Sequence, residues 1–570
     1  MKRLIQHWSM AALAALASLT AQAEVPADRV FYGEHIVTMD PAQPKAAAVA
    51  IRGDRIVYVG DAGGAETFRG SNTKVVQLGD RALIPGMIDS HGHVAMAARL
   101  IDWVNASSPP VGPAESIDDI LELLKQRLAS RPPEAGEWLL AYGYDDSLLA
   151  EKRHPTRVDL DTVSTEVPIY MMHVSGHLGA AKSAALAAVG IDENTPDPEG
   201  GVFRRMPGSS VPNGVVEEAA IYPLVMERLM PGEEDPAIFR EQMKKAVTYF
   251  ARHGVTTIQD GGASMADLET MRDMAADGEI GADIMVMPRV VGIALDEAAS
   301  LYAQGYFADR VSLRGVKFVL DGSPQGRTAW TTEPYIELPD GAEHPYIAYP
   351  TVAPAKFKAE AKSYLLAGIP IYMHANGDAA IDLAMDAVDE AFAGREIPDH
   401  RSVIIHAQLM RPDQVERAAE LKMVPSFYSA HAFFWGDWHR RSFGDERAFG
   451  ISPARSALEH GVNFTIHNDT PVVPPHMMRL MWAAVNRETR DGVTLGADER
   501  LAPYDALYAL TQGGAYQYFE EDMKGSLTVG KQADLVILGA NPLEVPPGSI
   551  KDIPVLETIS RGESIFRAQE

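Results

Sequence analysis

Two histidines separated by one residue, His91 and His93, close an apolar stretch that begins at Leu83. The stretch reads LIPGMIDSHGH, and its first part is typical of a buried strand. Because side chains alternate between the two faces of a strand, both imidazoles are expected to point the same way. Neutral imidazole is a common ligand of catalytic zinc. A chain with 17 histidines can contain such a pair by chance, so a metal site needs further ligands elsewhere.

Residues of metal-site type also end four other apolar runs. Lys317 and Asp321 are four residues apart in GVKFVLD, so a strand would carry both on one face. A lysine inside a core is costly unless it is paired or modified. The remaining candidates are His374 after IPIYM, His406 after VII, and His467 with Asp469 at the end of FTIHND. Strand-end histidines together with an acid and a lysine indicate a metal-binding active site.

These runs belong to a regular alternation of strand-like and helix-like segments. Alternation of this kind is typical of a parallel α/β fold. Eight strands are the number that a closed, TIM-like (β/α)8 barrel needs, and such a barrel carries its chemistry at the carboxyl ends of the strands. The predicted strands are Leu83–His93, Gly254–Asp260, Ile284–Val291, Gly315–Asp321, Ile369–His374, Ser402–His406, Met423–Tyr428 and Asn463–Asp469.

A long segment separates the first predicted strand from the second. At roughly 160 residues it far exceeds one crossover helix, so we expect an insertion at about residues 101–215 that forms part of a lid. The insertion carries His177 in HVSGH, and Glu218 follows it in PNGVVEE. His177 could reach a substrate from above, and a structural loop histidine is an equally good interpretation.

Both ends of the chain contain short β-rich pieces separated by glycine, aspartate and proline. We expect residues 24–80 and 521–570 to build one small β-sandwich. Residues 81–520 would then hold the barrel and its insertion.

The first 23 residues have the layout of a secretory signal, with MKR, an apolar run and then Ala21-Gln22-Ala23. Cleavage near Ala23 would leave a periplasmic or secreted protein. No later segment offers about 20 uninterrupted apolar residues, so no membrane partner is expected. The net charge of −27 argues against nucleic acid as a partner. The expected partner is a small-molecule substrate, and a homodimer remains open.

The chain resembles the amidohydrolase superfamily, and specifically its family 3 branch of YtcJ-like metal-dependent hydrolases. The resemblance covers nearly all of the chain after the signal and rests on PGMIDSHGH, GVKFVLDGS, HANGDAAI, IIHAQ, HNDTPV and GSLTVGKQADLVIL. It implies one or two Zn²⁺ ions, or another divalent metal, held by His91, His93, Lys317, His374, His406 and Asp469. It also implies that Asp469 is the general base and that Lys317 is carboxylated. An ion pair of Lys317 with Asp321 or Asp469 is the alternative.

Other residues are expected around the substrate. His177 is a second catalytic candidate, and the expected substrate-binding residues are His467, Asp321, Glu218 and Trp435. Trp435 lies in the aromatic segment FFWGDW, which is either core or one wall of an apolar pocket. His467 and Asn468 stand where members of the family usually have Gly-Ser, which adds an imidazole beside the proposed base.

The expected reaction is hydrolysis of a non-peptide carbon–nitrogen bond in an amide, formamide or cyclic amide. Metal lowers the pKa of bound water, and a carboxylate takes the water's proton. A deaminase or an ester or lactone hydrolase would use the same site. A periplasmic binding protein without catalysis is the alternative from another class, and the intact ligand set opposes it.

Overall fold

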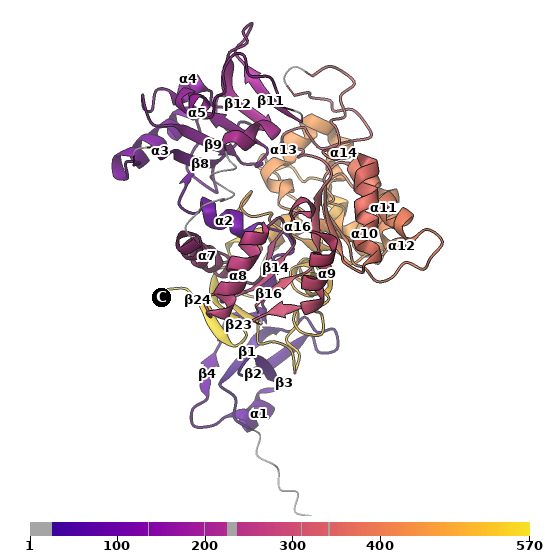
Figure 1. Cartoon of the computed structure of the whole chain (residues 1–570). Helices are drawn as coiled ribbons and strands as arrows, with labels where there is room; N and C mark the ends of the chain where they lie inside the picture. The colour runs from indigo at the N-terminus through magenta and orange to yellow at the C-terminus, as the bar shows by residue number, and fades with distance from the viewer. Residues whose placement is uncertain are drawn as a thin grey trace, which may run out of the picture.

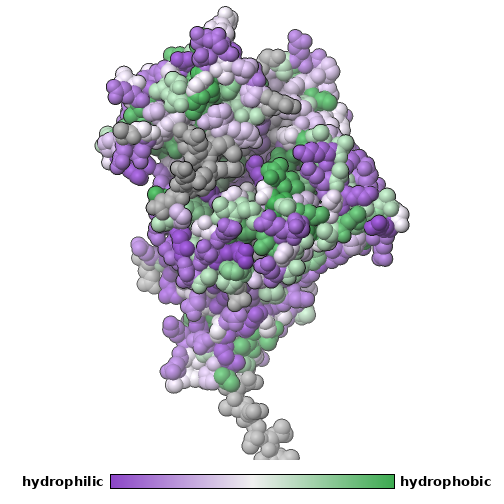
Figure 2. Space-filling model, viewed as in Figure 1, coloured by the Kyte–Doolittle hydropathy of each residue, from purple (hydrophilic) through white to green (hydrophobic). Residues whose placement is uncertain are grey.

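A computed structural model of the chain describes residues 25–134, 136–198, 200–224, 236–308, 310–339 and 342–569. Three parts follow one another along the molecule: a sheet at the bottom, a central α/β part, and an upper part formed by the insertion (Figure 1). Hydrophilic residues cover much of the face seen in Figure 2, in keeping with the net charge of −27. Within the described ranges, no helix combines the length and the apolar character that crossing a membrane requires. The predicted signal at residues 1–23 lies outside these ranges.

The lower part is a sheet of eight strands drawn from both chain ends. They are β1 (Arg29–Val37), β2 (Lys45–Arg52), β3 (Arg55–Gly60), β4 (Lys74–Gln77), β5 (Ala82–Pro85), β22 (Leu535–Leu538), β23 (Val555–Ser560) and β24 (Glu563–Arg567). Their order is β24-β23-β22-β5-β1-β2-β3, with β4 paired to β1. The two ends meet where Ile537 of β22 pairs with Leu83 of β5, and both side chains are buried. The two ends of the chain therefore share one hydrogen-bonded sheet, and its arrangement as a β-sandwich stays a prediction.

The central part contains two five-stranded sheets. The first is formed by β6 (Met87–Ile88), β13 (Val255–Asp260), β14 (Asp283–Val286), β15 (Tyr306–Phe307) and β16 (Val311–Leu313), and the second by β17 (Val316–Val319), β18 (Ile371–Ala375), β19 (Val403–His406), β20 (Val424–Phe427) and β21 (Thr465–Ile466). All pairings are parallel except that of β15 with β16. Isolated parallel bridges join the sheets, Arg289 to Lys317 and Gly92 to Thr470. Each of the eight predicted runs contributes a strand to this mixed α/β fold.

The first predicted strand is divided between two sheets. β5 belongs to the lower sheet and β6 to the central part, and Gly86 stands between them. A Cβ atom at Gly86 would lie 2.2 Å from Oγ1 of Thr256, so only glycine fits this crossing without a shift. The prediction of one strand over Leu83–His93 is therefore wrong in its extent. His91 and His93 lie in the loop after β6, and His93 is the N-cap of the next helix.

Helices follow most strands of the central part and pack their apolar faces into its large core. α11 illustrates the pattern, since its buried residues include Ile381, Met385 and Val388 at helical spacing. The helices after the insertion are α7 (Pro236–Ala251), α8 (Met265–Ala276), α9 (Leu295–Gln304), α10 (Pro354–Leu366), α11 (Asp378–Phe392), α12 (Pro412–Glu420), α13 (His431–Phe443), α14 (Asp445–Phe449), α15 (Ala454–Glu459), α16 (Met477–Asn486), α17 (Pro503–Ala509) and α18 (Gln512–Gln517). Two more, α1 (Ala62–Ala65) and α2 (Val94–Leu100), precede the insertion.

The insertion builds its own six-stranded sheet above the central part (Figure 1). Its strands are β7 (Val104–Asn105), β8 (Leu139–Tyr144), β9 (Ile169–His173), β10 (Leu178–Ala181), β11 (Gly201–Arg205) and β12 (Pro212–Glu218), in the order β11-β12-β10-β9-β8-β7. Helices α3 (Ile117–Ser130), α4 (Arg157–Leu160) and α5 (Ser183–Ala188) accompany them. α3 begins after Ser116, whose side chain accepts the N–H of Asp119, and it buries Ile120 and Leu124.

Candidate metal centre

Asp469 is the residue around which the histidines gather. Its Oδ1 atom lies 3.3 Å from Nε2 of His91 and 3.3 Å from Nε2 of His93, and its Oδ2 atom lies 4.0 Å from Nε2 of His406. Its backbone is left-handed, with φ of 56°, which is uncommon outside glycine and is found where the surroundings enforce it. Burial opposes ionisation of Asp469, but the neighbouring His93 and His467 hold its pKa below the ordinary value. Asp469 is therefore present as a carboxylate.

His91 is held with one ring nitrogen free for a metal. Its Nδ1 atom lies 2.6 Å from Oε1 of Gln259, whose amide nitrogen donates to the carbonyl oxygen of Ser90 and to the hydroxyl of Tyr518. The amide oxygen can only accept, so Nδ1 of His91 carries the hydrogen and Nε2 keeps its lone pair. Burial lowers the pKa of His91 well below its ordinary value, so the ring is neutral, as a metal ligand must be.

His406 is supported in the same way by His467. Nδ1 of His406 lies 3.1 Å from Nε2 of His467, and Nδ1 of His467 lies 2.9 Å from the hydroxyl of Ser426. Donation from His406 to His467 and from His467 to Ser426 leaves Nε2 of His406 with a free lone pair. His467 is completely buried, and burial lowers its pKa to about 3. One nitrogen of His467 is thus engaged with His406 and the other with Ser426, and the contact of His467 with substrate stays a prediction.

His374 lies beside His406, with ring centroids 4.6 Å apart. Its Nδ1 atom is 3.2 Å from Oδ1 of Asp321. Asp321 is completely buried, and its oxygens also accept the backbone N–H groups of Asn376, Gly377 and Trp330 at 3.0, 2.8 and 3.0 Å. Asp321 therefore orients His374, and its contact with substrate stays a prediction. The same engagement leaves it unavailable for an ion pair with Lys317.

Lys317 points into the cluster from β17. Its Nζ atom lies 3.3 Å from Nε2 of His91, and the residue is only 3 % exposed. Burial lowers the pKa of Lys317 to about 7. A large share of this amine is therefore uncharged near neutral pH, which removes part of the cost of burying it.

Two residues of the insertion lie beside the histidine cluster of the central part. Nδ1 of His177 lies 2.8 Å from Oε2 of Glu218, and the ring of His177 is 6.0 Å from that of His374 between centroids. Burial opposes protonation of His177, but the Glu218 carboxylate raises its pKa above the ordinary value. The structure thus brings the two predicted lid residues together at the cluster.

Trp435 lies behind the residues next to the cluster, with its ring centroid 6.2 Å from that of Tyr428 and 4.8 Å from that of His431. Its Nε1 atom donates to Oδ2 of Asp145 at 2.8 Å, and the residue is 3 % exposed. The bond ties α13 to the insertion, and the role of Trp435 in a substrate pocket stays a prediction. Sequence reasoning also missed Gln259 and Ser426, which hold ring nitrogens. The place of Gln259 near the end of a predicted strand was the available signal.

The donor set fits a divalent metal. Ligand atoms of His91, His406 and Asp469 all lie within 4.8 Å of one another. With zinc bonds of 2.0–2.1 Å, two ligand atoms of a tetrahedral site lie about 3.3 Å apart, which matches the spacing of Asp469 Oδ1 from the nitrogens of His91 and His93. Oδ1 of Asp469 is buried and makes no hydrogen bond of good geometry with any described residue. An ion bound between these atoms would satisfy it.

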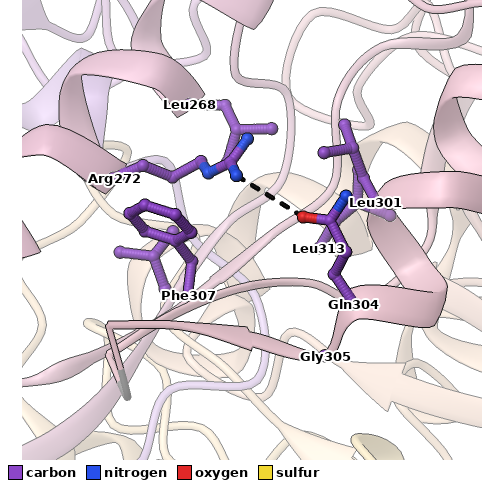
Figure 3. A pocket seen from close by; sticks show the side chains of 8 residues that line it. Leu268, Arg272, Leu301, Gln304, Gly305, Phe307 and Leu313 are labelled. Atoms are coloured by element: carbon purple, nitrogen blue, oxygen red, sulfur yellow. Dashed lines mark hydrogen bonds between the residues drawn. The ribbon is translucent and has the colours of Figure 1, made fainter.

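A separate hollow lies on the outer side of the central part, between α8 and α9 (Figure 3). Arg272 donates to Gln304 across it at 3.4 Å, and Leu268, Leu301 and Phe307 form its walls. Its volume of about 10 Å³ admits no more than a water molecule. It contains no residue of metal-binding type, so it does not compete with the histidine cluster as the candidate site.

Comparison with known proteins agrees with this geometry. Residues 74–566 match the model of the amidohydrolase family. The N-substituted formamide deformylase of Arthrobacter pascens is 27% identical, over 94% of this chain and 97% of its own length. The putative amidohydrolase YtcJ of Bacillus subtilis is 23% identical over 94% and 99% of the two chains. The crystal structure of an uncharacterized metal-dependent hydrolase from Pyrococcus horikoshii superposes with a TM-score of 0.71 at 22% identity, covering 91% of this chain and 99% of that one.

The family model spans most of the chain, and its match includes every residue of the buried cluster around Asp469. The chain therefore belongs to the amidohydrolase family, in the YtcJ-like family 3 branch.

Proposed function

We propose that this protein hydrolyses a non-peptide carbon–nitrogen bond of a small molecule, in an N-substituted formamide or a related amide. The observation that carries the proposal is the unpartnered Oδ1 atom of Asp469 between the nitrogens of His91 and His93. A base placed beside a metal-type cluster is what hydrolysis by activated water requires. The relative that is an N-substituted formamide deformylase favours formamides within this class.

The proposed site is the mouth of one barrel. The two parallel sheets, joined at both edges by the bridges of Lys317 and Gly92, would form a single (β/α)8 barrel. His91, His93, His374 and His406, with Lys317 and Asp469, would hold one or two Zn²⁺ ions at its carboxyl end. When bound, the metal lowers the pKa of water and polarises the substrate's carbonyl group.

Asp469 would move the proton. As a carboxylate it accepts the proton of the attacking water while the new carbon–oxygen bond forms. It then returns this proton to the nitrogen as the carbon–nitrogen bond breaks, so that an acid and an amine leave. His177, oriented by Glu218, would contact the substrate from the insertion side and hold it against the cluster.

Lys317 would act as a carbamate. Its neutral amine can add CO2 and release a proton to solvent, which leaves an anionic carbamate ligand, and the pKa of about 7 supplies the neutral amine. The test is nuclear magnetic resonance of protein loaded with ¹³C-labelled bicarbonate, in which a carbamate signal is expected for the wild type and not for Lys317→Gln. A signal of equal size in both proteins would exclude Lys317 as the modified residue.

We also propose that the protein is exported and that its partner is a small molecule. Residues 1–23 favour export, followed by cleavage near Ala23, to the periplasm or medium. The net charge of −27 favours a small molecule over nucleic acid as the partner.

The reaction is tested with metal-loaded protein and a panel of formamides, other amides, cyclic amides, lactones and aminated heterocycles. Release of amine from formamides or amides is the expected result. Turnover confined to lactones or aminated heterocycles would replace the proposal with an ester hydrolase or a deaminase. Metal-loaded protein that turns over nothing in the panel would favour a binding protein.

A further inference from the structure

Tyr428 stands directly against the candidate metal centre. It follows β20, and its ring centroid lies 5.9 Å from that of His406 and 5.2 Å from that of His467. The ring centroid of His431 lies 4.3 Å from that of Tyr428. The residue is 1 % exposed, so the phenol ring is part of the packed wall of the site.

The hydroxyl of Tyr428 is buried and has no hydrogen-bond partner among the described residues. Buried tyrosine hydroxyls ordinarily find a partner, and an orphaned one calls for an explanation. The ring contacts with His406 and His467 keep this hydroxyl group next to the cluster of predicted metal ligands. Phenylalanine would pack at this position equally well. We therefore expect the hydroxyl group to form its hydrogen bond with a bound substrate.

We propose that the Tyr428 hydroxyl donates a hydrogen bond to the carbonyl oxygen of the substrate. The bond strengthens as that oxygen becomes negative in the tetrahedral intermediate, which is how a preorganised donor lowers the barrier. Tyr428 would then be a catalytic residue that works beside Asp469. This inference rests on the proposed hydrolysis of a carbon–nitrogen bond.

The chain offers a matched control in Tyr170. Tyr170 lies on β9 of the insertion, is completely buried, and also has a hydroxyl without a partner among the described residues. Its neighbours are apolar residues of the insertion core, such as Leu186 and Phe203. Tyr170→Phe therefore removes another buried, unpartnered hydroxyl group, away from the metal centre.

The test compares Tyr428→Phe, Tyr170→Phe and wild type, all loaded with metal. Turnover of N-(2-phenylethyl)formamide should fall about 100-fold in kcat for Tyr428→Phe, with KM changed less than about threefold. Bound metal should be unchanged, and Tm unchanged or raised, because removing an unpartnered buried hydroxyl costs no hydrogen bond. Tyr170→Phe should behave similarly in Tm and keep the wild-type kcat.

A second measurement does not depend on the substrate. Benzylphosphonate carries tetrahedral oxyanions, and its binding by calorimetry should be at least tenfold weaker in Tyr428→Phe than in wild type and Tyr170→Phe. One outcome is that wild type binds benzylphosphonate at least tenfold more tightly than Tyr428→Phe and yet hydrolyses no formamide. That result would refute the proposed function and retain Tyr428 as a hydrogen-bond donor to a ligand oxygen. Equal binding by all three proteins, or by none, would overturn the inference. So would a clear fall in Tm or in bound metal for Tyr428→Phe.

Discussion

Nδ1 of His374 lies 3.2 Å from Oδ1 of Asp321, so a fully buried carboxylate fixes the orientation of a predicted metal ligand. Carboxylates placed behind metal-binding histidines raise the basicity of the ring and hold its tautomer. Asp321 thus belongs to the support of the centre. It also accepts three backbone N–H groups, which hold it rigidly in place.

Asp321→Asn is expected to weaken metal binding by about 10- to 100-fold, because the amide cannot supply the negative charge behind His374. The measurement is competition with a chelator of known affinity. Asp378→Asn is the control, since the carboxylate of Asp378 bonds to Thr332 and Arg411 instead. Equal metal affinity in both variants and the wild type would contradict the role of Asp321.

Asp469→Asn is expected to lower kcat by about 1000-fold, because an amide cannot accept the proton of water. Metal should stay bound through the remaining histidines. The measurement pairs kcat with metal content per chain, which separates loss of the base from loss of the ion. Turnover within about threefold of wild type would remove Asp469 from the role of base.

The backbone of Glu218 leads to a third prediction. Glu218 has φ of 48° and ψ of −120°, a conformation that glycine adopts far more easily than other residues. Glu218→Gly and Glu218→Ala both remove the carboxylate beside His177, so both should lower kcat/KM by a similar factor of about ten. The glycine variant should be more stable than the alanine variant by about 1–3 kcal/mol, because only glycine relieves the strain. Chemical denaturation measures the difference, and equal stabilities would show that no strain is stored at Glu218.

The metal-type residues could be predicted because each of them ends an apolar run. His374 and His406 end the parallel strands β18 and β19, and parallel strands bring their ends to one edge. His91 and His93 do lie in the cluster. The prediction placed them on one face of a strand, whereas in the structure they follow β6 in a loop. What places them is the pairing of Gly92 with Thr470.

The supporting residues could not be predicted in the same way. Ser426 bonds to His467 and Gln259 bonds to His91, and each of these partners is distant in the sequence. The contacts of Asp321 with His374 and of His467 with His406 were not predicted, because strand periodicity gives the face of a residue and not its depth. Depth depends on which neighbours cover that face, and those neighbours are distant in the sequence.

A buried histidine pair makes the stability of the protein depend on pH. Nδ1 of His431 lies 2.8 Å from Nε2 of His439 within α13, and both rings are buried. The two neutral rings share one hydrogen, and protonating both of them would place two N–H groups face to face. Burial lowers the pKa of His439 to about 3, against about 6.5 in an unfolded chain.

Between these two values the unfolded state binds the proton and the folded state does not. The contribution of His439 is therefore fully present above about pH 6.5 and is lost as the pH falls toward 3, by up to about 1.4 kcal/mol per pH unit. We expect the free energy of unfolding, measured with urea, to fall from pH 7.5 to pH 5.0. The fall should be smaller in His439→Gln, because the glutamine amide can hydrogen-bond to His431 and does not take up a proton. His460→Gln is the control, because it makes the same substitution at a histidine whose side chain is 42% exposed. If His439→Gln loses as much stability between these pH values as the wild type, the acid sensitivity lies with other buried groups.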